Sequence, residues 1–182
     1  MIILDIDVDF FFYPVFWGNI SKEKEKLKLK ISEMNQIYLV ENIIDKFNLN
    51  KNIEGAVFDT HKEIFNYLKN YKDIHLIHLD AHPDLGSLMG NHYKKEITDG
   101  NICAKLIEYG KIKKYDWVHN DENKNKDIIN KIYFYRNNVF NYNEIFYDRY
   151  SFKGNIDLLL ITLSKEWCPP NNIAKDILLN LK

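Results

Sequence analysis

The run Ile74-His75-Leu76-Ile77-His78-Leu79 is followed directly by the polar motif Asp80-Ala81-His82-Pro83-Asp84. Residues 74–80 predict a buried parallel strand, because strands covered on both faces carry near-continuous apolar side chains. The Asp-x-His-x-Asp motif therefore begins where the strand ends, and ligand sites of open α/β sheets gather at the carboxyl ends of strands. Two carboxylates and an imidazole at alternate positions predict half of an oxygen-rich divalent-metal site.

Strand and helix patterns alternate along the rest of the chain. Strands are predicted at residues 1–10, 55–59, 74–80, 115–119, 132–136 and 156–164, helices at 21–47, 61–71, 101–109 and 171–181, and an exposed loop at 120–127. This alternation indicates an α/β fold with a mostly parallel sheet covered by helices on both faces. At 182 residues the chain is expected to form a single domain, 1–182, with a sizeable core.

Composition narrows the classes of partner. A net charge of -1 gives no general attraction to nucleic acid or to an anionic membrane. Aspartates interrupt the apolar N-terminus and no basic segment precedes it, so neither a signal peptide nor a membrane span is expected there. Cys103 and Cys168 lie far apart in sequence, which argues against a disulfide framework and fits a reducing cytoplasm.

A second metal half-site is predicted near the N-terminus. In the stretch Asp5-Ile6-Asp7-Val8-Asp9 the carboxylates fall on one face of the predicted strand, because strand side chains alternate. The flanking residues are too apolar for a solvated edge, and like charges buried together without a cation would be very costly. A metal on this face is therefore the preferred interpretation. His61, directly after the predicted strand 55–59, is a further candidate ligand, although a lone histidine there is often only a helix-start residue.

Taken together, the candidate ligands at residues 5–9, His61 and residues 80–84 resemble the motifs of the arginase and agmatinase (ureohydrolase) superfamily, and most closely those of the small peptide arginases. Those enzymes convert arginine side chains in ribosomally made peptides to ornithine. The superfamily pattern is a histidine after one strand, Asp-x-His-x-Asp after the next, and Ser-Phe/Ile-Asp-x-Asp after another. His61, residues 80–84 and residues 5–9 correspond to these pieces. Here the Asp-x-Asp strand comes first, whereas in arginases it follows the Asp-x-His-x-Asp strand.

The resemblance implies an abbreviated arginase/deacetylase-like three-layer sandwich that binds two Mn²⁺ ions per chain. The implied ligands are His61, Asp80, His82, Asp84, Asp7 and Asp9. Asp80 and Asp7 would bridge the ions, and Asp5 would stand behind the ligands at the usual serine position. A register with Asp5 and Asp7 as ligands stays open, although the strand-end argument favours the later pair. Ligation by many carboxylates and only two histidines suits Mn²⁺ better than zinc.

The implied reaction converts an arginine side chain, in a precursor peptide or another guanidino substrate, to ornithine and urea through a metal-bridging hydroxide. Asp84 would pass a proton to the leaving amine, and Glu166 would bind the guanidinium through paired charge-assisted hydrogen bonds. Asn101 would bind the substrate. Cys103 stands where arginases have a histidine proton shuttle, so that role is absent or belongs to another residue such as His92.

Two features admit a second interpretation. The aromatic residues Phe10, Phe11, Phe12, Tyr13, Phe16 and Trp17 follow the first metal strand and either line the mouth of the site or pack in the core. The N-terminal strand also resembles the first motif of haloacid dehalogenase-type phosphatases, with Asp5 as nucleophile and Asp7 as acid/base. That alternative leaves residues 80–84 without a role. A single-zinc deacetylase and a non-catalytic metal-binding partner module are the remaining alternatives.

Overall fold

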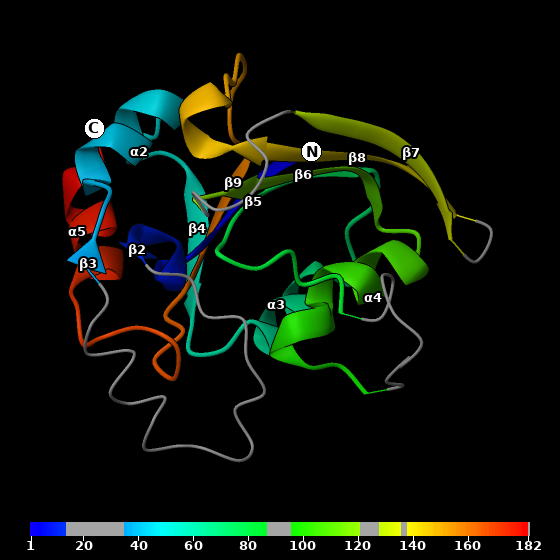
Figure 1. Cartoon of the computed structure of the whole chain (residues 1–182), viewed down its shortest axis with the longest axis horizontal. Coiled ribbons are helices and arrows are strands. Elements are labelled where there is room, and N and C mark those ends of the chain that lie inside the picture. Colours follow the sequence, from blue (N-terminus) through cyan, green and yellow to red (C-terminus); the bar gives the residue numbers. More distant parts are fainter. Residues whose placement is uncertain (14–34, 87–95, 121–127, 136–137, 182) are drawn as a thin grey trace.

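The computed structural model describes residues 1–13, 35–86, 96–120, 128–135 and 138–181 (Figure 1). Within these ranges, seven strands form one sheet in the order β4-β9-β1-β5-β6-β8-β7. Their bounds are Ile2–Asp7 (β1), Glu54–Phe58 (β4), Ile74–Leu79 (β5), Ile112–His119 (β6), Ile129–Tyr135 (β7), Asn138–Phe146 (β8) and Leu158–Thr162 (β9). Every neighbouring pair is parallel except β7 and β8. A short antiparallel pair, β2 (Phe12–Tyr13) and β3 (Asn35–Gln36), lies outside this sheet.

Helices cover both faces of the sheet. Helices α2 (Val40–Phe47) and α5 (Ile173–Asn180) pack on one face, and α3 (Lys62–Leu68) and α4 (Ile102–Glu108) on the other (Figure 1). Leu4 and Ile6 of β1 belong to the core beneath α2 and α5, whereas Ile3 belongs to the core beneath α3 and α4. Because strand side chains alternate, Asp5 and Asp7 lie on the α3/α4 face.

The predicted α/β class with a mostly parallel sheet is confirmed, and helices on both faces are compatible with a three-layer sandwich. The prediction of a strand over residues 1–10 is wrong at its end. The strand stops at Asp7, whose side chain accepts a hydrogen bond from the Asp9 amide at 3.0 Å and caps a 3-10 turn, η1 (Val8–Phe11). Asp9 therefore reaches the site from a turn and not from the strand.

Within the described residues, the predicted helix over 21–47 is confirmed at 40–47 and wrong at 35–39. Asn35–Gln36 pairs with β2, and α2 begins only at Val40; residues 21–34 lie outside the described residues. Strand β8 was not predicted at all, because its apolar positions are interrupted by asparagines at 138, 141 and 143.

The predicted exposed loop at 120–127 is corrected at its first residue. Asn120 is fully buried, and its amide donates hydrogen bonds to the backbone carbonyls of Phe10 and Phe12. This residue ties the end of β6 to the turn that carries Asp9. Residues 121–127 lie outside the described part of the chain.

Candidate metal centre

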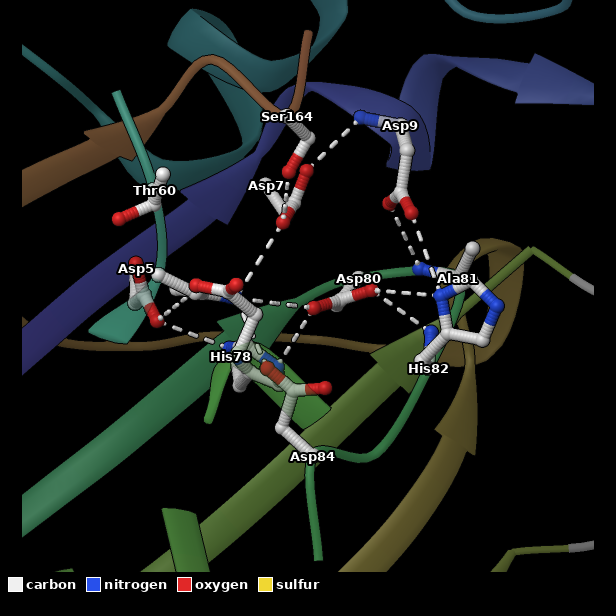
Figure 2. A network of polar contacts seen from close by, with 12 residues as sticks. Asp5, Asp7, Asp9, Thr60, His78, Asp80, Ala81, His82, Asp84 and Ser164 are labelled. Carbon is white, nitrogen blue, oxygen red and sulfur yellow. Dashed lines mark hydrogen bonds and ion pairs between the residues drawn. The ribbon is translucent and has the colours of Figure 1, made fainter. Parts of the chain in front are cut away.

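The predicted ligands meet at one edge of the sheet, where the neighbouring strands β4, β9, β1 and β5 end (Figure 2). Asp7 is the last residue of β1, and Asp9 follows in the 3-10 turn. His61 lies between β4 and α3, and Asp80 comes directly after β5. Parallel strands bring their carboxyl ends together, so residues far apart in sequence converge as the strand-end argument predicts.

His61 faces carboxylates through both ring nitrogens. Its Nε2 lies 3.0 Å from Asp5 Oδ2, while its Nδ1 lies 2.8 Å from Asp84 Oδ2 and 3.2 Å from Asp7 Oδ2. A neutral imidazole donates a hydrogen bond from only one nitrogen. If Nε2 donates to Asp5, the Nδ1 lone pair points toward carboxylate oxygens, and a cation between them would stabilise that arrangement. A carboxylate that holds the far nitrogen of the ring is a common partner of metal-binding histidines.

Asp80 lies between two histidines. Its Oδ2 is 3.6 Å from His61 Nδ1, and its Oδ1 is 3.6 Å from His82 Nδ1. The same nitrogen of His82 lies 3.2 Å from Asp9 Oδ2. Two groups of potential ligand atoms result, each within 4.8 Å: His61, His78, Asp80 and Asp84 in one, and Asp9, Asp80 and His82 in the other. Asp80 is common to both groups.

The carboxylates of the cluster are buried close together, which favours binding of a cation. The five carboxylates of the cluster are nearly inaccessible, with exposed fractions of 1% for Asp5 and Asp80, 4% for Asp7 and Asp9, and 6% for Asp84. Among the described residues, no lysine or arginine pairs with any of them. Asp84 Oδ2 also has no partner of hydrogen-bonding geometry. Buried like charges need compensation by a cation, so this cluster can hold a metal ion.

The electrostatics divide the cluster into favoured and disfavoured charges. Burial raises the pKa of Asp5, but His61 and His78 outweigh it and lower that pKa to about 2. Burial together with the charge of Asp80 raises the pKa of Asp84 to about 6. The pKa of Asp7 lies well above its usual value because burial and the neighbouring carboxylates of Asp9 and Asp80 disfavour its charge. The charge of Asp5 is thus stabilised by imidazoles, whereas His61 and Ser164 stabilise the charge of Asp7 too little to offset burial and the neighbouring carboxylates.

Divalent-ion binding is therefore expected to release protons and to tighten as the pH rises. Burial lowers the pKa of His82, but Asp80 and Asp9 outweigh it and raise that pKa to about 12, so the ring keeps a proton at neutral pH. A ligand must lose its proton to bind a metal, and raised pKa values mean that protons compete with the ion. Calorimetric titration with Mn²⁺ between pH 6 and 8, in buffers of different ionisation enthalpy, would measure this release. A binding heat independent of the buffer would contradict it.

His78 is a member of the cluster that the sequence did not single out. It is fully buried, with Nδ1 2.9 Å from Asp5 Oδ2 and Nε2 2.9 Å from Asp80 Oδ2 (Figure 2). Strand alternation could have identified His78, because it precedes Asp80 by two residues and therefore lies on the same face of the strand. The ring therefore joins the carboxylate behind His61 to the carboxylate that both groups share.

His78→Leu is expected to weaken Mn²⁺ binding by roughly 10- to 100-fold, the usual cost of losing a residue that orients metal ligands. Leucine is of similar size but leaves Asp5 and Asp80 without the imidazole. Competition with a chelator of known affinity measures the change. The matched control is His75→Leu, because His75 is on the same strand, faces the opposite side and contacts Asp116. Equal affinity of the two variants would contradict a role for His78.

Two further residues fix the ligands and were also missed. The Ser164 hydroxyl donates to Asp7 Oδ2 at 2.5 Å, and the Trp117 indole donates to the Asp80 carbonyl at 3.0 Å. Ser164 follows β9 by two residues, so the strand-end rule that identified Asp80 points to it as well. Trp117 has no comparable signal, because an aromatic residue in a strand usually indicates packing.

A cavity of about 670 Å³ opens beside the cluster. Its lining includes Asp7, Asp9, Asp80, Asp84, His61 and His82. Glu166 also lines it, is exposed, and follows β9 near Ser164. The predicted metal ligands and the predicted guanidinium-binding residue therefore share one cavity.

Asn101 does not support the role predicted for it. Its side chain accepts a hydrogen bond from the Thr98 amide and donates one to the Glu96 carbonyl, and it does not line the cavity. It caps the turn before α4. Cys103 is likewise buried away from the cavity, and burial raises the pKa of its thiol to about 12. It therefore cannot serve as a proton shuttle, and His92 lies outside the described residues.

The aromatic run after β1 packs in the core. Phe10, Phe11 and Phe12 are at most 4% exposed, and the Phe10 ring stacks on Tyr38 at 5.2 Å. None of the three lines the cavity. The suggestion that they form its mouth is therefore wrong, while Phe16 and Trp17 lie outside the described residues.

Comparison with protein-family models, curated proteins and solved structures finds no match for this chain. No helix in the described ranges combines the length and apolar character needed to cross a membrane. The function is therefore inferred from the side chains of the site and their geometry.

Proposed function

We propose that this chain is a binuclear metal-dependent ureohydrolase, which cleaves the guanidinium group of an arginine side chain or similar compound to an amine and urea. The observation that carries the proposal is the position of Asp80, whose two oxygens each lie 3.6 Å from a histidine Nδ1 atom. One carboxylate shared by two ligand groups is what a pair of bridged ions requires. We further propose that the sandwich is an abbreviated arginase/deacetylase-like fold.

In this proposal two divalent ions occupy the cluster. His61 and Asp84 would hold one, His82 and Asp9 the other, and Asp80 and Asp7 would be shared. This set contains more carboxylate oxygen than zinc sites usually do, and it suits Mn²⁺. Such ions, when bound, lower the pKa of water so that a nucleophile for the guanidinium carbon is present at neutral pH.

The charge of the cavity supports a cationic substrate. Among the described lining residues, Lys165 is the only lysine or arginine, and its ammonium lies 2.6 Å from Asp59 Oδ1. Glu166 is exposed beside this pair and would bind the planar guanidinium through two charge-assisted hydrogen bonds. A substrate of the opposite charge would meet a carboxylate-rich wall.

Asp84 is the residue we propose for proton transfer. Hydrolysis adds water to the guanidinium carbon, breaks the bond to the side-chain nitrogen, and moves a proton from that water to the departing amine. Asp84 lines the cavity, and among the described residues its Oδ2 has no partner of hydrogen-bonding geometry, although it approaches His61 Nδ1 to 2.8 Å. The carboxylate of Asp84 would take the proton and return it to the leaving nitrogen.

The phosphatase alternative fits the site less well. Asp5 would be its nucleophile, yet Asp5 is 1% exposed, is bonded to His61 and His78, and does not line the cavity. The burial of Asp5 and its absence from the cavity lining argue against this alternative.

The proposal is tested by incubating the Mn²⁺-loaded protein with arginine, agmatine and an arginine-containing peptide. We expect urea from at least one of them and, for the peptide, the mass loss of arginine-to-ornithine conversion. Glu166→Gln should raise KM with a smaller effect on kcat, and Glu41→Gln, on the exposed face of α2, should change neither. Hydrolysis of a generic phosphate ester without turnover of any guanidino compound would overturn the proposal.

A further inference from the structure

Asp5 holds two imidazole rings at once behind the metal cluster. His61 Nε2 lies 3.0 Å and His78 Nδ1 2.9 Å from the same atom, Asp5 Oδ2, and Figure 2 shows the contact of His78. A carboxylate only accepts hydrogen bonds, so each ring donates toward Asp5 and turns its second nitrogen toward the other carboxylates of the cluster. A carboxylate that holds the far nitrogen of the ring is typical of metal-binding histidines, and Asp5 does this for both rings.

The second nitrogen of His78 lies close to a carboxylate without forming a hydrogen bond to it. His78 Nε2 is 2.9 Å from Asp80 Oδ2, yet among the described residues it is buried without a partner of hydrogen-bonding geometry. Asp84 Oδ2 shows the same combination at 2.8 Å from His61 Nδ1. Short contacts without hydrogen-bonding geometry are expected of atoms that bind a common ion, because their lone pairs point at the ion and not at one another.

The two groups of potential ligands differ in their nitrogen atoms. The group that contains His61 and His78 offers two imidazole nitrogens, whereas the group that contains His82 offers one. Imidazole suits Zn²⁺ and Fe²⁺, while carboxylate oxygen suits Mn²⁺. Two ion positions that share Asp80 would therefore differ in the ions that they prefer.

We propose that His78 is itself a metal ligand through Nε2, and that it makes the position it shares with His61 selective for a nitrogen-preferring ion such as Zn²⁺ over Mn²⁺. The inference rests on the two-ion centre of the proposed function and not on its substrate. His78 is fully buried and does not line the cavity, so it acts on the ion and does not touch a substrate. The alternative is an imidazolium that only pairs with Asp5 and Asp80.

Long-range ¹H–¹⁵N spectra of the histidine rings, recorded before and after addition of Zn²⁺, test this directly. Zinc is diamagnetic, and a ring nitrogen that binds it has a chemical shift distinct from that of a protonated or a free nitrogen. We expect Nδ1 of His78 to stay protonated and Nε2 to become zinc-bound with the first equivalent of Zn²⁺. A His78 ring without a zinc-bound nitrogen at saturating Zn²⁺ would overturn the inference.

His78→Asn distinguishes a ligand from a residue that only orients Asp5. The asparagine amide can keep the hydrogen bond to Asp5 but places no atom where Nε2 lies. We expect the Zn²⁺ affinity to fall by more than about 100-fold, the upper end of the usual cost of losing an orienting residue, and the Mn²⁺ affinity to fall by less. His75→Asn, on the opposite face of the same strand, is the matched control. Equal losses for the two ions would contradict the inference, and the wild-type spectra decide it even if His78→Asn does not fold.

These measurements separate the inference from the proposed function, because neither depends on turnover. A zinc-bound His78 in a protein that forms no urea from any guanidino compound would refute the ureohydrolase and retain His78 as a ligand. Urea formation by a protein whose His78 binds no zinc would do the reverse.

Discussion

Asp80→Asn is expected to remove metal binding and hydrolase activity together while the protein stays folded. Asparagine has the same shape but lacks the charge, and only one of its two terminal atoms can coordinate a cation. Because Asp80 belongs to both ligand groups, one substitution affects both ions. Metal analysis after Mn²⁺ loading should fall from two ions per chain to near zero, and kcat/KM should fall by at least about 10³-fold, in line with ~4 kcal/mol of lost transition-state stabilisation.

The control for this substitution is Asp176→Asn, which makes the same chemical change on the exposed face of α5. It should keep full metal content and activity. Circular dichroism of Asp80→Asn checks that the fold is retained. An Asp80→Asn protein that still bound two ions would show that the ligand assignment is wrong.

Mn²⁺ is expected to raise the Tm of the wild-type protein by roughly 8–16 °C. A ligand at about 1,000 times its Kd adds about 4 kcal/mol to the free energy of unfolding. Each kcal/mol shifts the Tm of a domain of this size by about 2–4 °C. Thermal unfolding with added Mn²⁺ and with chelator measures the difference, and a Tm unaffected by the ion would contradict the account.

Asp7→Asn is expected to abolish the stabilisation by Mn²⁺ without lowering the Tm of the metal-free protein. The raised pKa of Asp7 means that its charge is disfavoured by burial and by Asp9 and Asp80 when no ion is present. A neutral amide removes that unfavourable charge, so the Tm in chelator should equal or exceed that of the wild type. The increase caused by Mn²⁺ should disappear. A lower Tm in chelator would indicate that the Asp7 carboxylate stabilises the protein without a metal.

Much of the site could be predicted because it depends on a simple rule. Residues that follow parallel strands meet at one edge of the sheet, and this rule brings together His61, Asp7 and the motif at 80–84. None of these residues lies on β8, so the site was predictable although that strand was not. Asp9 joined the cluster through a 3-10 turn that no periodic pattern reveals.

The errors came from side chains whose partners the sequence pattern does not reveal. Asn101 has the residue type of a substrate ligand, but backbone groups of its own turn occupy its amide. Phe10 follows a metal strand, yet the direction of its side chain depends on where the chain turns. Asn120 looked like a loop residue and is buried because it binds carbonyls more than 100 residues away, at Phe10 and Phe12. Such long-range pairings are set by the packed structure and leave no local signal.

Electron paramagnetic resonance of the Mn²⁺-loaded protein tests the central claim most directly, because it distinguishes one ion from a coupled pair. Two ions that share the carboxylate of Asp80 would lie about 3.5–4 Å apart, close enough for their spins to interact. We expect the multiline, temperature-dependent spectrum of an exchange-coupled pair, lost in Asp80→Asn. The six-line spectrum of isolated Mn²⁺ at full occupancy of the wild-type protein would contradict a shared, binuclear centre.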